Sequence, residues 1–89
     1  MLLADLTSPQ VRKLDRNLPV IIPIAAHEQH GAHLPLFTDS YLLGEVVRRT
    51  EVARSTEVLI APLQWLGNPH HRRDFPGTLS AQPRLYLDL

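Results

Sequence analysis

The chain has no cysteine, and neither sign of charge predominates, because nine Lys and Arg residues stand against nine Asp and Glu residues among 89. Without cysteine no disulfide can form, so the usual marker of an oxidising compartment is missing and a cytoplasmic location is expected. The balanced charge offers no basic field to nucleic acid or to an anionic membrane surface. Neither is therefore expected as a partner.

Long apolar runs are also missing. The two longest, residues 18–26 and 58–63, each contain a proline. Both fall far short of the ~20 residues that a membrane-spanning helix needs. No basic segment leads into an apolar run at the N-terminus, so no signal peptide is predicted. The length allows one domain at most, and a domain this small buries only about 60% of the surface of its extended chain.

The first part of the chain predicts a short helix followed by a buried strand. A serine and a proline at the start of residues 8–17 can cap a helix and occupy its first turn, and the asparagine at position 17 ends it. Residues 18–26 are almost uniformly apolar and rich in β-branched side chains. This pattern is typical of a strand that is buried on both faces of a parallel sheet.

A second helix and a second strand are predicted further along. Thr38 is a good N-cap, and apolar residues at helical spacing predict a helix from Asp39 to about Ala53. Residues 58–63 predict another buried strand, which completes a strand-helix-strand unit of the α/β class with a parallel sheet. Residues 65–78 predict a long loop, and loops of that length are usually functional or disordered. Residues 80–89 predict the start of a further helix.

Histidines and carboxylates gather in residues 27–39, His-Glu-Gln-His-Gly-Ala-His-Leu-Pro-Leu-Phe-Thr-Asp. Imidazole nitrogen and carboxylate oxygen together suit divalent cations such as zinc and manganese. A zincin helix is excluded, because its two histidines are four residues apart whereas His27 and His30 are three apart. On an extended backbone Glu28 and His30 point to the same side. A loop that returns the chain to Asp39 would let these three side chains converge.

The segment Glu-Gln-His-Gly-x-His-Leu-Pro, followed by Thr-Asp, resembles the N-terminal metal motif of the creatininase family (creatinine amidohydrolases). The Phe-Pro-Gly-Thr sequence at positions 75–78 resembles a second signature of that family, in the right order, and the resemblance runs from about Leu18 to the end of the chain. It implies a three-layer α/β/α fold and hydrolysis of C–N bonds in cyclic or small amides by water that two divalent metal ions activate. The resemblance also implies zinc or manganese, with iron a further candidate, and a homo-oligomer in complete family members.

By the same resemblance, Glu28 would bind one metal ion, His30 the other, and Asp39 would bridge the two. Two cations about 3.5–4 Å apart need a shared anion to offset their repulsion, which agrees with this allocation. Taken without the resemblance, a histidine near a strand end is more often a hydrogen-bonded structural group. An aspartate in a first turn is likewise often no more than a favourable helix charge. No catalytic residue beyond the metal ligands is assigned.

The remaining histidines receive supporting roles. His33, within the first motif, is expected to orient a ligand or shape the loop. His70 and His71, beside two arginines, could line a site for a polar or anionic substrate, and a solvated loop face is an equal alternative. His27 faces away from the three candidate ligands by the alternation of an extended backbone, so it is interpreted as structural.

The chain is expected to be the N-terminal portion of a single creatininase-like domain. Leucines at three alternate positions end the sequence in an apolar stretch with no polar tail: Leu85, Leu87 and Leu89. The family's remaining His and Glu ligands have no counterpart here. Two functions stay open. One is part of a metal-dependent amidohydrolase, inactive on its own; the other is a non-catalytic remnant that acts by association through a sheet edge and its apolar end.

Overall fold

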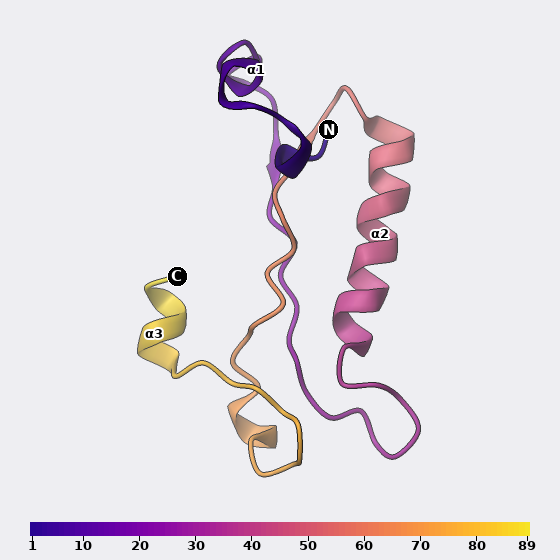
Figure 1. Cartoon of the computed structure of the whole chain (residues 1–89), viewed down its shortest axis with the longest axis vertical. Helices are drawn as coiled ribbons and strands as arrows, with labels where there is room; N and C mark the ends of the chain where they lie inside the picture. The colour runs from indigo at the N-terminus through magenta and orange to yellow at the C-terminus, as the bar shows by residue number, and fades with distance from the viewer.

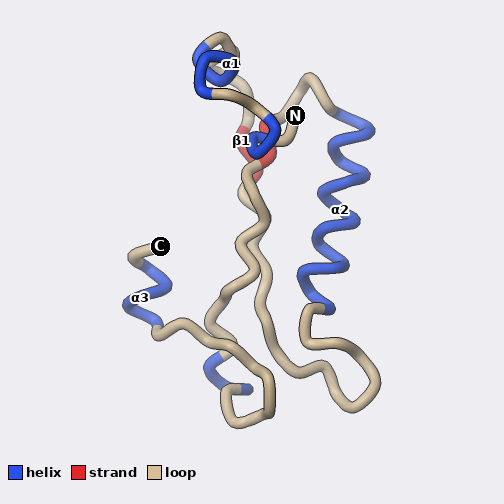
Figure 2. Tube along the Cα trace, in the orientation of Figure 1, coloured by secondary structure: helices blue, strands red, loops and turns tan.

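Two neighbouring parallel strands, joined by a long helix, form the centre of the structure (Figures 1 and 2). The computed structural model describes residues 1–89. Its elements in chain order are η1 (Leu3–Asp5), α1 (Ser8–Arg12), β1 (Val20–Ile21), α2 (Thr38–Arg54), β2 (Leu59–Ile60), η2 (His70–Arg72) and α3 (Pro83–Leu87). Because α2 connects two parallel neighbours, the predicted strand-helix-strand unit and α/β class are confirmed. In Figure 1, α2 lies on one side of the strands and α1 and α3 lie on the other.

The hydrogen-bonded part of the sheet is shorter than the sequence predicts. β1 and β2 comprise two residues each, whereas the apolar runs at 18–26 and 58–63 predict continuous strands. The runs stay alongside each other, since Ile24 and Gln64 form a further parallel bridge. Proline has no N–H to donate and interrupts such a ladder. Three prolines lie within the two runs: Pro19, Pro23 and Pro62.

The second strand, β2, is buried and the first is not. Leu59 and Ile60 are 8% and 1% exposed. β2 has β1 on one edge and the N-terminal residues on the other, where Leu2 forms a parallel bridge with Ile60. Three side chains of the first run are instead open to solvent: Val20 (57%), Ile22 (63%) and Ile24 (57%). The prediction that residues 18–26 are buried on both faces is therefore wrong for this chain, because no other segment of the chain covers these three side chains.

The start of α2 differs from the prediction by one residue. Thr38 is the first helical residue rather than the N-cap, and its Oγ1 donates a hydrogen bond to the carbonyl oxygen of Pro35. Phe37 takes the N-cap position without a side-chain hydrogen bond. The shift leaves Asp39 in the first turn of the helix, as the sequence predicts.

The first helix is shorter than predicted. α1 ends at Arg12 rather than at Asn17, and Thr7 rather than Ser8 is its N-cap. The backbone N–H of Asn17 donates to Asp15 Oδ1 (2.9 Å). Such a local turn offers the backbone an alternative to continuing the helix.

The last third of the chain follows the prediction more closely. Residues 65–78 form a loop whose helical part is the single turn η2. α3 begins at Pro83, within the predicted segment 80–89, and proline suits a first helical turn. No helix of the structure combines the length and the apolar character needed to cross a membrane.

Candidate metal centre

Glu28, His30 and Asp39, called the ligand cluster below, come together where the first apolar run ends and α2 begins. One possible ligand atom from each residue lies within 4.8 Å of the other two, and all three residues are half-buried. Glu28 and His30 follow the run that contains β1, and Asp39 lies in the first turn of α2. The structure thus brings together the three residues that the sequence singles out as candidate ligands.

Two glycines shape the loops around the ligand cluster. Gly31 has a φ of +75°, a left-handed conformation that glycine adopts at no steric cost, and its N–H donates to Gln29 Oε1 (2.8 Å). Gly77, in the second motif, has a φ of +83°, and a Cβ at this position would collide with the side chain of Leu36. Both motifs therefore need glycine at their turns.

Two contacts fix the tautomer of His30. Nδ1 lies 3.0 Å from the carbonyl oxygen of Glu28, which can only accept, so Nδ1 carries a proton and donates it. Nε2 lies 3.0 Å from Asp39 Oδ1. In the neutral ring, two acceptors would then face each other. The contact is favourable only with a cation, either a proton on Nε2 or a metal ion bound by both atoms.

The same surroundings raise the pKa of His30 above its ordinary value of 6.5. The largest cause is the hydrogen bond to the Glu28 carbonyl; the hydrogen bond to Asp39 and the charges of Asp39 and Glu28 add to it, and partial burial opposes them. A proton and a metal ion compete for Nε2. Metal binding is therefore expected to weaken as the pH falls through the raised pKa of His30.

The carboxylate of Glu28 is shielded from solvent and incompletely satisfied. Its side chain is 16% exposed, and its Oε2 is buried without a hydrogen-bond partner. Arg72 Nε lies 3.6 Å from Oε2, which allows charge attraction but is too long for a hydrogen bond. A buried carboxylate oxygen is costly unless it has a donor or a cation. This unsatisfied oxygen, together with the imidazole and the second carboxylate, fits a divalent metal ion.

The second motif holds the loop that carries Glu28 and His30. The backbone N–H of Gln29 donates to Thr78 Oγ1 (3.1 Å), and the N–H of Leu79 donates to the carbonyl oxygen of His27 (2.9 Å). The residue between the two candidate ligands is thus fixed from a distant part of the sequence. This role of the second motif is not predictable from the sequence, because no local pattern relates the two loops.

An open cleft of about 640 Å³ lies beside His30 and joins the two motifs. Its apolar wall comes from both loops: Leu34, Pro35, Leu36, Phe75 and Pro76. His30 is the member of the ligand cluster that lines this cleft, and Gln29 beside it adds a further polar side chain. A small molecule in this cleft would have an imidazole at one side and apolar surface at the other.

The other histidines lie outside the ligand cluster. His33 is exposed near the turn at Gly31. His70 Nε2 contacts the guanidinium of Arg73, and His71 Nε2 accepts a hydrogen bond from Arg72 Nε (3.1 Å). Their predicted parts in orienting ligands or lining a substrate site stay predictions.

His27 lies among aromatic rings, outside the ligand cluster. Its ring centroid is 5.9 Å from those of Phe37 and Trp65. Sequence reasoning interprets His27 as structural, and this surrounding is compatible with that interpretation. The same reasoning missed Arg72, which it treats only as a neighbour of two loop histidines, although Arg72 reaches Glu28.

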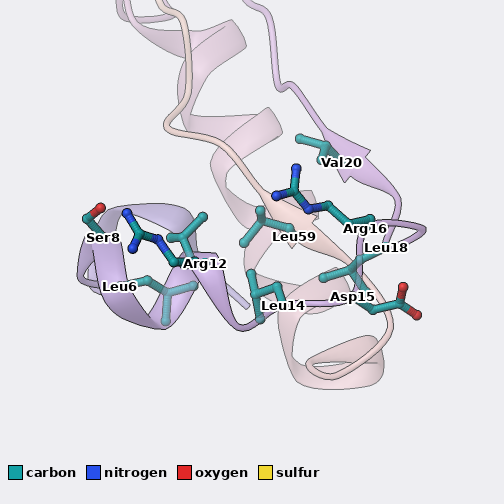
Figure 3. Close-up of a pocket in the computed structure, with 10 residues that line it drawn as sticks. Leu6, Ser8, Arg12, Leu14, Asp15, Arg16, Leu18, Val20 and Leu59 are labelled. Atoms are coloured by element: carbon teal, nitrogen blue, oxygen red, sulfur yellow. The ribbon is translucent and has the colours of Figure 1, made fainter.

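A separate cavity of about 600 Å³ lies between α1 and the strands (Figure 3). Its wall is largely leucine and valine, with Arg12 and Arg16 as its cationic groups. Asp15 is its only carboxylate, and it contains no histidine. Because a metal ion needs several convergent donors, this cavity is not a second metal site.

Comparison with known proteins identifies relatives of the chain. It is 35% identical to the mycofactocin precursor peptide peptidase of Mycolicibacterium smegmatis over 74 residues, which cover 78% of this chain and 30% of that protein. It is 39% identical to the protein of the same name from Mycobacterium tuberculosis over 71 residues (68% and 28%). It is 29% identical to the 3-dehydro-scyllo-inosose hydrolase of Thermotoga maritima over 85 residues (93% and 27%).

These matches cover only 27–30% of the length of the relatives. No solved structure matches the chain. The family model of creatininase, described as creatinine amidohydrolase, matches residues 4–89, which is nearly the whole chain and includes both motifs. The chain belongs to the creatininase family.

Proposed function

We propose that the chain contributes part of the metal centre of a metal-dependent hydrolase that cleaves C–N bonds in small or cyclic amides. The observation that carries this proposal is the convergence of Glu28, His30 and Asp39, one ligand atom of each lying within 4.8 Å of the other two, together with the buried Glu28 Oε2 that has no hydrogen-bond partner. The family match over residues 4–89 supports the same reaction class.

Each member of the ligand cluster has a distinct part in this proposal. His30 offers Nε2, because its Nδ1–H is engaged by the Glu28 carbonyl. Asp39 offers a carboxylate at the positive end of the α2 dipole, and Glu28 offers its unsatisfied Oε2. A divalent ion held by these three residues would supply Lewis-acid chemistry and would lower the pKa of a bound water molecule toward neutrality. Zinc and manganese both suit this mixed nitrogen and oxygen set.

The number of donors limits the number of metal ions. Three protein ligands with one open position are sufficient for a single catalytic zinc ion. A second ion needs donors beyond the ligand cluster. We therefore expect the 89-residue chain to bind at most one divalent ion, weakly, and we propose the two-metal centre only for a protein with the full length of the relatives.

The cleft beside His30 is the proposed site of the amide substrate. Apolar residues of both motifs would contact the substrate's non-polar part, and His30 of the ligand cluster would lie next to its carbonyl group. Two of the relatives are named as peptide peptidases, and a peptidase hydrolyses a C–N bond. Protonation of the leaving nitrogen requires a further group, so the isolated chain is expected to show no substantial amidase activity.

A non-catalytic role through association is the second candidate. The observation that favours it is the exposure of apolar side chains along the first strand, at the edge of the sheet. Unpaired strand edges with apolar surface are templates for pairing with another chain. This candidate predicts that substitutions in the ligand cluster leave the association of the chain unchanged.

Calorimetric titration of chelator-treated protein with Mn²⁺ tests the proposed metal site. Asp39→Asn retains the size of the side chain but loses the charge, so it is expected to lower Mn²⁺ affinity by about 100-fold. Glu45→Gln is the matched control, because Glu45 is an exposed carboxylate on the same helix that pairs with Arg48. Equal Mn²⁺ affinity in wild type and Asp39→Asn would refute the proposed ligands.

A further inference from the structure

Arg72 contacts both the ligand cluster and the backbone that positions it. Its NH1 donates to the carbonyl oxygen of Gln29 (3.2 Å), the residue between Glu28 and His30. Its Nε lies 3.6 Å from Glu28 Oε2. The side chain of Arg72 is 39% exposed, whereas that of Glu28 is 16% exposed, so the guanidinium approaches the shielded carboxylate from the solvent side.

We propose that Arg72 is a positioning residue of the metal site whose fixed positive charge holds Glu28 in place and lowers the affinity of the site for a divalent cation. This inference rests on the proposed metal site. Neither the family match nor the relatives' names assign any role to this residue. It explains how a shielded carboxylate can be kept close to another acid, Asp39, and still retain an oxygen available to a metal ion.

The charge of Arg72 acts on Glu28, whereas its hydrogen bonds go to other residues. The guanidinium donates to the Gln29 carbonyl and to His71 Nε2, but it makes no hydrogen bond to Glu28. It therefore attracts the carboxylate without occupying the lone pairs of Oε2. A cation bound at Oε2 would share Glu28 with Arg72, and the two positive charges would repel each other.

The loop is also held by hydrogen bonds from residues other than Arg72. The N–H of Gln29 donates to Thr78 Oγ1 and the carbonyl oxygen of His27 accepts from Leu79, and neither of these hydrogen bonds involves the arginine. Removal of the guanidinium should thus change the charge at the site more than its shape. The expected sign is a gain of metal affinity when Arg72 is neutralised. A purely structural residue would give a loss instead.

The magnitude follows from the repulsion between a divalent and a monovalent charge in a partly hydrated site. We expect Arg72→Met to bind Mn²⁺ about tenfold more tightly than wild type at low ionic strength. The Debye length falls to about 3 Å in 1 M salt, so this difference should shrink to within about twofold there. In the absence of metal, Arg72→Met should have a lower thermal midpoint than wild type, because Glu28 loses its neighbouring positive charge.

The test compares four chelator-treated proteins by calorimetric titration with Mn²⁺ in about 20 mM and 1 M salt, with thermal midpoints from circular dichroism. Arg72→Lys keeps the charge and should bind within about twofold of wild type. Arg73→Met is the matched control, because it removes the adjacent arginine, whose guanidinium contacts His70 rather than the ligand cluster. It should also bind like wild type.

The outcomes separate this inference from the proposed function. Tighter Mn²⁺ binding by Arg72→Met alone, abolished by salt, supports the role of Arg72, even where wild-type binding is too weak to measure. Measurable binding by wild type with equal or weaker binding by Arg72→Met overturns the role of Arg72 and leaves the metal site standing. Equal tightening by Arg72→Lys also overturns it, because the charge is retained. Absence of Mn²⁺ binding in all four proteins overturns both proposals.

Discussion

The loop of the ligand cluster and the first strand are adjacent in the sequence, yet their surroundings differ. The loop is held by hydrogen bonds from residues 72–79, as between Gln29 and Thr78, which are 49 residues apart. The apolar run at 18–26 pairs with one neighbouring strand and leaves its isoleucines at 22 and 24 exposed. Specific polar contacts within this chain are thus enough to build the candidate site. The apolar side chains of the same chain do not, however, cover the sheet next to this site.

Substitutions in the two apolar runs, residues 18–26 and 58–63, should show the largest difference in stability. Ile60→Ala removes a side chain that is 1% exposed and should lower the free energy of unfolding by about 2–5 kcal/mol. Ile24→Ala, at a residue that is 57% exposed, should cost less than about 1 kcal/mol. Urea unfolding followed by circular dichroism measures both. Equal costs would mean that the first strand is as well covered in solution as the second.

Two glycines provide the next largest contrast. Gly77→Ala places a side chain at a φ of +83° and should cost about 1–2 kcal/mol. Gly44→Ala, in α2 with open space around its Cα, should instead stabilise the protein by about 0.5–1 kcal/mol. The free energies of unfolding of both variants are compared with wild type. A neutral Gly77→Ala would show that the left-handed turn of the second motif is not required.

Thr78 tests whether the second motif positions the ligand loop. Thr78→Val removes the acceptor for the Gln29 N–H and should cost about 1 kcal/mol of stability. It should also weaken Mn²⁺ binding by about tenfold, as loss of a group that orients metal ligands commonly does. Thr56→Val, at an exposed residue beyond the end of α2, is the control. A stability loss with unchanged Mn²⁺ affinity would restrict Thr78 to a structural role.

The smallest expected effect concerns an exposed ion pair away from both regions. Hydrogen bonds from Arg48 and Arg49 lower the pKa of Glu45 from 4.5 to about 2. Because the pKa is lower in the folded state, the stabilisation is fully present above pH 4.5 and is lost as the pH falls toward 2. The difference in thermal midpoint between wild type and Glu45→Gln should therefore decrease over this interval, most clearly at low salt. A difference that is constant from pH 6 to about 2 would contradict the assigned shift.

The sequence predicts what depends on neighbours along the chain. Alternation after an apolar run places Glu28 and His30 on one side, and helical spacing places Asp39 at the start of α2, so their convergence could be expected. The exposure of the first strand could not be predicted from the sequence, because it depends on which other segments cover the sheet. The contacts of Arg72 with Glu28 and of Thr78 with Gln29 join residues more than forty positions apart, and no local pattern specifies them.

Paramagnetic broadening by Mn²⁺ tests most directly whether the ligand cluster binds a metal ion. Spectra of ¹⁵N-labelled protein are recorded with substoichiometric Mn²⁺ and again after addition of a chelator. The account predicts that amide signals of residues 28–31 and 39–40 lose intensity first, whereas those of α1 are retained. Broadening centred on the exposed carboxylates Glu45 or Glu57, or spread evenly over the chain, would contradict a metal site at Glu28, His30 and Asp39.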